Sequence, residues 1–131
     1  MIYLDNSATT SLLPEVKQAM IAQMEKYGNP SSLYMIGAEN KVALRNARTQ
    51  VATLVGCNRK QIYFTSGASE SNSWVFMQAF DYAQKHGLGN HIITSMIEHH
   101  SILDVCDYLH KYRGADITYL GVDKDGYVQP E

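Results

Sequence analysis

Two short segments of the sequence place small or polar residues where a helix is expected to begin. They are "TSGASE" at residues 65–70 and "MIEHHS" at residues 96–101. A helix N-terminus presents unpaired N–H groups and a partial positive charge. In the first segment Gly67 and Ala68 leave the backbone uncovered, so a phosphate group can approach it. In the second, Glu98, His99 and His100 bring imidazoles that can stack on a planar ligand, move a proton or bind a metal.

Each segment also has an explanation that involves no ligand. In the first, the side chain of Ser66 or Ser69 would cap the helix, with Glu70 in its first turn. In the second, two histidines would lie in a polar loop by chance. The glycine spacing matches neither the dinucleotide-binding fingerprint nor the P-loop. No cluster of Cys or Asp completes a metal shell beside the histidines, so we expect no metal site.

The elements that position these segments follow from the spacing of apolar residues. Helices are predicted over residues 14–28, 37–55, 69–86 and 101–113, and strands over residues 61–65, 91–95 and 116–120. The order β-α-β-α-β after residue 60 predicts an α/β fold with a mainly parallel sheet and right-handed crossovers. "DKDG" at 123–126 lacks the leading Asp and the distant Glu of a calcium loop, and we interpret it as a turn opening a hairpin.

Two regions are expected along the chain. Residues 1–60 form an N-terminal arm with connector helices, and residues 61–131 form the first part of an α/β domain. Both candidate segments follow a predicted strand, and ligands of open α/β sheets bind beyond the carboxyl ends of the strands. A phosphate cradle beside an imidazole suits a phosphorylated aromatic cofactor.

Composition limits the classes of function. The chain has 131 residues and a net charge of −2, which argues against a nucleic-acid partner. No apolar stretch approaches the ~18 residues of a membrane-spanning helix, and no signal peptide is visible. Cys57 and Cys106 form no C-x-x-C pair, which fits a reducing, cytoplasmic location.

A series of motifs carries a family resemblance. "YLDNSATT", "YGNPSS", "ARTQVATLVG", "IYFTSGASESNSWVF" and "HIITSMIEHHSILDVC" occur in this order. In content and spacing the sequence resembles the NifS-like cysteine desulfurases, which are pyridoxal-phosphate enzymes of the class V aminotransferase group with fold type I. The resemblance covers essentially the whole chain. The resemblance implies that the chain forms part of the large domain of that fold.

The resemblance also implies roles for individual residues. The backbone at Ala68 and Ser69 would hold the phosphate of pyridoxal 5′-phosphate. His99 would be the catalytic histidine that stacks over the cofactor ring and moves protons. Ala8 and Thr9 would line the substrate side.

The sequence departs from the family pattern in several places. Tyr34 stands where the family usually has a histidine, and Ser7 where alanine is common. The motifs of the lysine that binds the cofactor covalently, the aspartate on the pyridine nitrogen, the carboxylate-binding arginine and the nucleophilic cysteine are absent. None of the seven lysines follows the family's S-x-H-K pattern. We expect Cys106 to be a core residue, and Cys57 does not match the catalytic position.

These observations lead to a functional expectation. The chain is expected to be the N-terminal part of a homodimeric enzyme that converts L-cysteine to L-alanine. That enzyme would pass persulfide sulfur to an acceptor or scaffold protein for iron–sulfur clusters or tRNA thiolation. Alone, the chain should be inactive. The alternatives are a non-catalytic truncated folding or assembly unit, and part of another class V aminotransferase or lyase.

Overall fold

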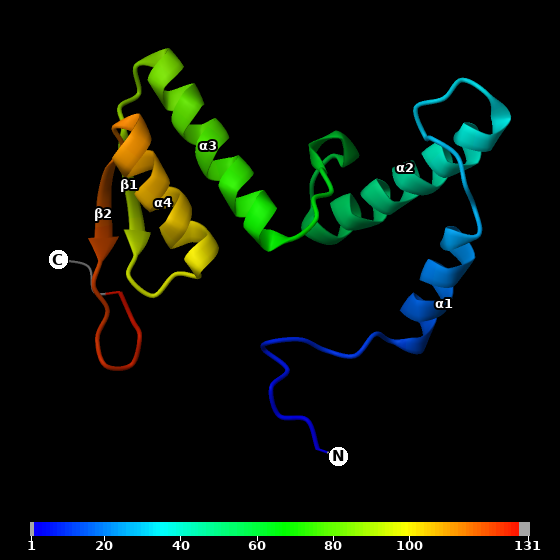
Figure 1. Cartoon of the computed structure of the whole chain (residues 1–131), viewed down its shortest axis with the longest axis horizontal. Coiled ribbons are helices and arrows are strands. Elements are labelled where there is room, and N and C mark those ends of the chain that lie inside the picture. The colour runs from blue at the N-terminus through cyan, green and yellow to red at the C-terminus, as the bar shows by residue number, and fades with distance from the viewer. Residues whose placement is uncertain (1, 129–131) are drawn as a thin grey trace. The chain divides into compact units, whose positions relative to one another are not determined.

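The computed structural model describes residues 2–128, and the chain forms two compact units, Met1–Tyr63 and Phe64–Glu131. Their boundary falls close to the predicted one after residue 60, and the roles assigned to the two regions stay predictions. The elements in chain order are α1 Pro14–Met24, α2 Met35–Val55, the 3-10 helix η1 Arg59–Gln61, α3 Ala68–His86, β1 His91–Ser95, α4 His100–Arg113 and β2 Asp116–Leu120 (Figure 1).

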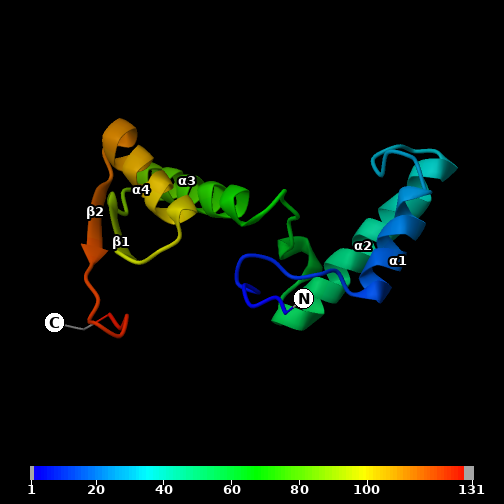
Figure 2. The same ribbon diagram turned by 60° about the horizontal axis from the view of Figure 1, so that its bottom comes forward.

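The second unit is an α/β arrangement built on two parallel strands. β1 pairs with β2 in register from His91 with Asp116 to Ser95 with Leu120, and α4 makes the crossover between them. The strands lie side by side, and α3 lies beside α4, in both views (Figures 1 and 2). The predicted α/β class with a parallel sheet is confirmed.

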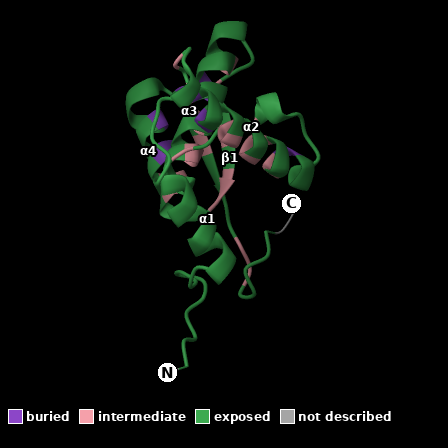
Figure 3. Cartoon of the chain, turned by 90° about the vertical axis from the view of Figure 1, so that its right-hand side faces the viewer, coloured by how far each residue is buried: buried purple, intermediate pink, exposed green. Residues whose placement is uncertain are grey.

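A small apolar core holds this unit together. Phe80 of α3 packs with Val105 and Leu109 of α4 and with Ala115, the residue before β2. The partly buried Phe76, Met77, Ile92 and Ile117 surround these four residues. Figure 3 shows that most of the chain outside such spots is exposed. Packing α3 and α4 together is what fixes the positions of their N-termini.

The predicted strand over residues 61–65 was wrong. Gln61 ends η1, and residues 62–65 join no ladder in the described part of the chain. Ile62 has strand-like angles, φ −94° and ψ 122°. An apolar run specifies an extended backbone, whereas a strand also needs a hydrogen-bonded neighbour, and β1 pairs with β2 instead.

Helix ends follow the glycine signals in three of four cases. α2, α3 and α4 are each followed directly by a glycine in a left-handed conformation, namely Gly56, Gly87 and Gly114. α1 ends at Met24, four residues before the predicted stop at Gly28.

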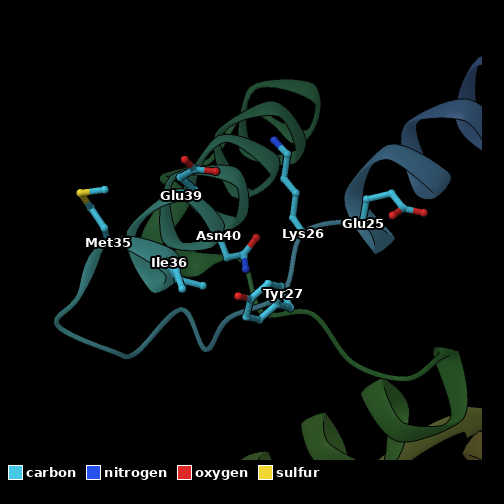
Figure 4. A pocket seen from close by; sticks show the side chains of 7 residues that line it. All are labelled: Glu25, Lys26, Tyr27, Met35, Ile36, Glu39 and Asn40. Carbon is cyan, nitrogen blue, oxygen red and sulfur yellow. The ribbon is translucent and has the colours of Figure 1, made fainter.

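The loop after α1 in the first unit is held by Asn40. Its Nδ2 donates to the carbonyl oxygen of Gly28 at 2.9 Å, and its Oδ1 accepts from Gln23 at 2.9 Å. A Cβ atom on Gly28 would lie 2.6 Å from Ile36, so a larger residue does not fit there. A hollow of about 260 Å³ lies beside this loop and is lined in part by Asn40 and Tyr27 (Figure 4).

The "DKDG" segment is a turn, as predicted. Asp123 Oδ1 accepts the N–H groups of Asp125 and Tyr127, each at 2.9 Å, and Val122 bridges Val128 in antiparallel fashion. Within residues 2–128, no helix is long and apolar enough to cross a membrane.

Candidate functional site

The N-terminus of α3 is left without a side-chain cap. Its N-cap residue is Gly67, and the first helical hydrogen bond runs from Ser71 N–H to the Gly67 carbonyl at 3.1 Å. In the described structure the N–H groups of Ala68, Ser69 and Glu70 have no acceptor. The alternative explanation, in which Ser66 or Ser69 caps this helix, was wrong, so three donors stay available at the start of α3.

Glu70 folds back onto the turn before α3. Its Oε2 accepts from both the backbone N–H and the Oγ of Ser66, each at 2.6 Å. The Ser66 side-chain hydrogen bond, and then the backbone one, lower the pKa of the Glu70 carboxyl. Thr65 Oγ1 lies 2.7 Å from Ser71 Oγ and donates to the Gly67 carbonyl at 3.0 Å. These bonds shape the turn without using the free N–H groups of the helix.

The chain's own structure does not require a glycine at position 67. Its φ of 168° and ψ of −178° describe an extended backbone that any residue adopts. A Cβ atom built there would meet nothing within 4 Å. Open space beside three unpaired N–H groups is the geometry that an anion needs at a helix N-terminus.

The N-terminus of α4 is capped by a side chain. His99 is its N-cap, and His99 Nδ1 accepts the backbone N–H of Ser101 at 3.1 Å. Ser101 Oγ lies 2.9 Å from the same nitrogen and accepts from Asn72 Nδ2 of α3 at 2.9 Å. Because Nδ1 acts as an acceptor, the neutral ring carries its proton on Nε2. Asn72 and Ser101 therefore fix the ring of His99 and link it to α3.

Sequence reasoning missed Asn72 and Ser101. Their side chains belong to different helices, 29 positions apart, and they meet only because α3 packs on α4. The usable signal was weak: Asn72 lies three residues beyond Ser69, which places it about one turn along the same helix.

A groove joins the two helix N-termini. It has a volume of about 480 Å³ and is lined by Ser69, Ser73, Met77, His99, His100, Ser101, Asp104, Val105 and Tyr108. Both helices begin at the end of the unit to which the strands point (Figure 1). The structure thus brings Ser69 and His99 to one concave surface, and Ala68 lies beside Ser69 in the first turn of α3.

The predicted substrate-side residues lie near the start of the chain. Ala8 and Thr9 belong to the first unit, where Ala8 N–H donates to the Asp5 carbonyl at 3.2 Å in an exposed turn. Their role stays a prediction, as do the roles of Ala68, Ser69 and His99.

The cysteines differ in environment. Cys106 is fully buried, which confirms it as a core residue, and burial raises the pKa of its thiol. Cys57 is exposed. Among residues 2–128, no cluster of three His, Cys, Asp or Glu residues is close enough to hold a metal ion.

Comparison with known sequences identifies relatives along the whole chain. The aminotransferase class-V family matches residues 2–131. The cysteine desulfurase IscS of Methanosarcina thermophila is 46% identical over 131 residues, covering 99% of this chain and 32% of that protein. The chain thus spans about a third of the length of curated relatives such as this one.

Solved structures give the same picture. A NifS-like protein superposes with a TM-score of 0.90 at 36% identity, covering 98% of this chain and 35% of the other. SspA in complex with cysteine superposes with a TM-score of 0.80 at 32% identity, covering 89% of this chain and 33% of the other. The fold of this chain is therefore that of the corresponding part of NifS-like enzymes.

Proposed function

Since this chain belongs to the aminotransferase class-V family, we propose that it holds the phosphate end of pyridoxal 5′-phosphate in a cysteine desulfurase. One observation carries the proposal. The uncapped N-terminus of α3 and the fixed ring of His99 meet at a single groove that also contains Ser69.

The residues at this groove fit the cofactor. The N–H groups of Ala68, Ser69 and Glu70 are unpaired donors for phosphate oxygens, and the Ser69 hydroxyl adds another. Gly67 leaves space for the phosphate to reach them. The carboxylate of Glu70 is turned toward Ser66, in the turn before the helix, where two hydrogen bonds from Ser66 offset its negative charge.

His99 would orient the ring of the cofactor and move a proton. Its Nδ1 is occupied by Ser101, so the Nε2–H is the group available for proton transfer. Asn72 and Ser101 act as positioning residues because they hold the imidazole plane in one orientation. The bound cofactor supplies an electron sink for reactions at the substrate α-carbon.

The reaction we propose for the enzyme to which this chain contributes is the conversion of L-cysteine to L-alanine. The C–S bond breaks, the sulfur passes to an enzyme thiolate as a persulfide, and an acceptor or scaffold protein then takes it for iron–sulfur clusters or tRNA thiolation. Support comes from relatives named cysteine desulfurases and from a solved relative in complex with cysteine. Ala8 and Thr9 would line the substrate side. The enzyme would act as a homodimer, and a reducing compartment such as the cytoplasm fits the two free cysteines.

On its own, this chain should lack desulfurase activity. None of its lysines follows the family's cofactor-binding pattern, and Cys106 is too buried to carry persulfide sulfur. The purified chain with pyridoxal phosphate and cysteine should therefore release neither alanine nor sulfide. Release of alanine at enzymatic rates would contradict this part of the proposal.

Phosphate binding is tested with a cofactor analogue that cannot react with lysine. Deoxypyridoxine phosphate lacks the aldehyde, and deoxypyridoxine lacks the phosphate as well. In amide NMR titrations, the phosphorylated analogue should shift the signals of residues 67–70 and bind about tenfold or more tightly than the other, since charge-assisted hydrogen bonds are its added interaction. Equal binding of the two analogues would refute the phosphate cradle. Such a result would favour the alternative hypothesis that this chain is a non-catalytic folding or assembly unit.

A further inference from the structure

A stretch of the first unit carries positive charge without compensation. Between Glu39 and Glu70 the sequence contains five basic residues and no acidic one. The basic residues are Lys41, Arg45, Arg48, Arg59 and Lys60. In a chain whose net charge is −2, this local excess indicates an anionic ligand.

The fold gathers four of these residues around one hollow. Arg45 and Arg48 lie three positions apart on α2, so they share a face of the helix. After the left-handed turn at Gly56, η1 contacts α2 and brings Arg59 and Lys60 to the same place. Ile62 and Tyr63 complete the lining of this hollow, which has a volume of about 290 Å³.

The position of the basic pair on η1 is fixed locally. Asn58 Oδ1 accepts the N–H of Lys60 at 2.9 Å, and Gln61 Oε1 accepts the N–H of Asn58 at 2.9 Å. This reciprocal capping box satisfies N–H groups at the start of the short helix and so stabilises it. The arginine and lysine that follow Asn58 are therefore presented by an ordered turn.

Arg48 gives the second, independent sign of a ligand. Its Nε is buried and has no hydrogen-bond partner in the described structure. The two ion pairs found among residues 2–128 join Arg113 to Asp81 and Lys124 to Asp125, so none involves the hollow. A buried donor without an acceptor is rare in native proteins and calls for a missing partner.

We propose that this cationic hollow, lined by Arg45, Arg48, Arg59 and Lys60, binds a phosphate group. Arginine forks match the oxygens of phosphate, and a dianion with several acceptors satisfies more of these donors than one carboxylate does. The small volume admits a phosphate and a small substituent but not a folded segment. The residues that line this hollow belong to the first unit, and those that line the groove at α3 belong to the second.

NMR of the 131-residue chain tests the proposal, because each site reports through its own signals. Inorganic phosphate is added at constant ionic strength, with the arginine Nε–H signals and the amide signals of residues 59–63 followed. We expect the Arg48 Nε–H signal to move and saturate at millimolar phosphate. Phenyl phosphate distinguishes the source: tighter binding indicates a phosphate monoester with an apolar group against Ile62, and equal binding indicates free phosphate.

Matched variants complete the test. Arg48→Gln and Arg59→Gln should each weaken phosphate binding about tenfold, as expected when a charge-assisted hydrogen bond is lost. Lys41→Gln removes a nearby charge that does not line the hollow and should leave binding unchanged. Circular dichroism confirms that the variants fold, and the amides of residues 67–70 report separately on the groove at α3. Failure of the Arg48 signal to move, equal loss in Lys41→Gln, or equally tight binding of glutarate would overturn the phosphate site.

Discussion

His99 combines two functions that a pair of substitutions can separate. It caps α4 through Nδ1 and, as we propose, orients the cofactor ring. His99→Ala removes both functions. His99→Asn removes the ring but keeps a side-chain acceptor, since asparagine is among the best N-cap residues.

The structure sets the expected stability changes. Replacing a capping side chain by alanine costs about 1 kcal/mol, and loss of the Ser101 Oγ contact adds a fraction of a neutral hydrogen bond of about 1 kcal/mol. His99→Ala should therefore lower the free energy of unfolding by about 1–2 kcal/mol. His99→Asn should stay within about 0.5 kcal/mol of the wild type. Neither substitution removes Asn72 or Ser101, so we expect the hydrogen bond between them to persist in both variants.

Two measurements read the two functions separately. Urea denaturation gives the free energy of unfolding, and NMR titration with deoxypyridoxine phosphate gives ligand affinity. We expect both variants to bind the analogue more weakly by a similar factor, although only His99→Ala loses stability. Wild-type affinity in His99→Asn would show that the histidine acts through the cap alone. An unchanged stability in His99→Ala would show that the cap contributes nothing.

Three further predictions concern titration and reactivity. The hydrogen bond from Tyr119 to Asp107 raises the pKa of Tyr119 to about 12. Because that pKa is raised, the hydrogen bond stabilises the fold fully below pH ~10, the usual tyrosine pKa. Its contribution is lost as the pH rises toward the pKa of Tyr119 in the folded chain. In an ultraviolet titration, Tyr119→Phe should lack one late-titrating tyrosine. A thiol reagent should modify Cys57 at once but Cys106 only after denaturant is added, since burial covers the latter and raises its pKa; rapid reaction of both would contradict the core. The pKa of Glu70 is lowered in the folded chain, so its hydrogen bonds stabilise the turn fully above the usual glutamate pKa of ~4.3 and are lost as the pH falls through the lowered pKa. Glu70→Gln should therefore flatten the dependence of unfolding free energy on pH in that acid range. An unchanged dependence on pH would refute this.

The helices and the two observed strands could be predicted from the sequence because their signals are local. The strand predictions at 91–95 and 116–120 match β1 and β2 residue for residue. The helix that ends at Gly114 was predicted from an apolar stripe followed by a glycine, and both features act within a few residues. Pairing is not local, which is why the apolar run at residues 61–65 was assigned to the sheet incorrectly.

Part of the candidate site could also be predicted from the sequence, because helix N-termini have local signals. "TSGASE" and "EHH" pointed to the N-termini of α3 and α4, and the groove contains Ser69 and His99. The details depended on side-chain geometry that spacing does not encode. The residue types suggested a serine cap for α3, but the Ser66 hydroxyl donates to the Glu70 carboxylate instead, and the helix has no side-chain cap.

The contrast between the two helix N-termini leads to a last prediction. α4 has a side-chain cap, and α3 has a glycine at that position although a side chain would fit. If the position serves only the fold, a capping residue there should be harmless. If it serves a phosphate, a capping carboxylate should compete with the ligand for the same N–H groups.

Gly67→Asp and its neutral match Gly67→Asn decide between these explanations. Both variants should be at least as stable as the wild type, because an acidic or amide cap improves on glycine by a few tenths of a kcal/mol, with a further ~0.3–1 kcal/mol from the aspartate charge. Binding of deoxypyridoxine phosphate should weaken in Gly67→Asn and vanish in Gly67→Asp, where the carboxylate also repels the phosphate. A stabilised Gly67→Asp that binds as well as the wild type would separate the open N-terminus of α3 from the phosphate. Loss of binding with gained stability would instead show that the glycine is kept for the ligand at the expense of the fold.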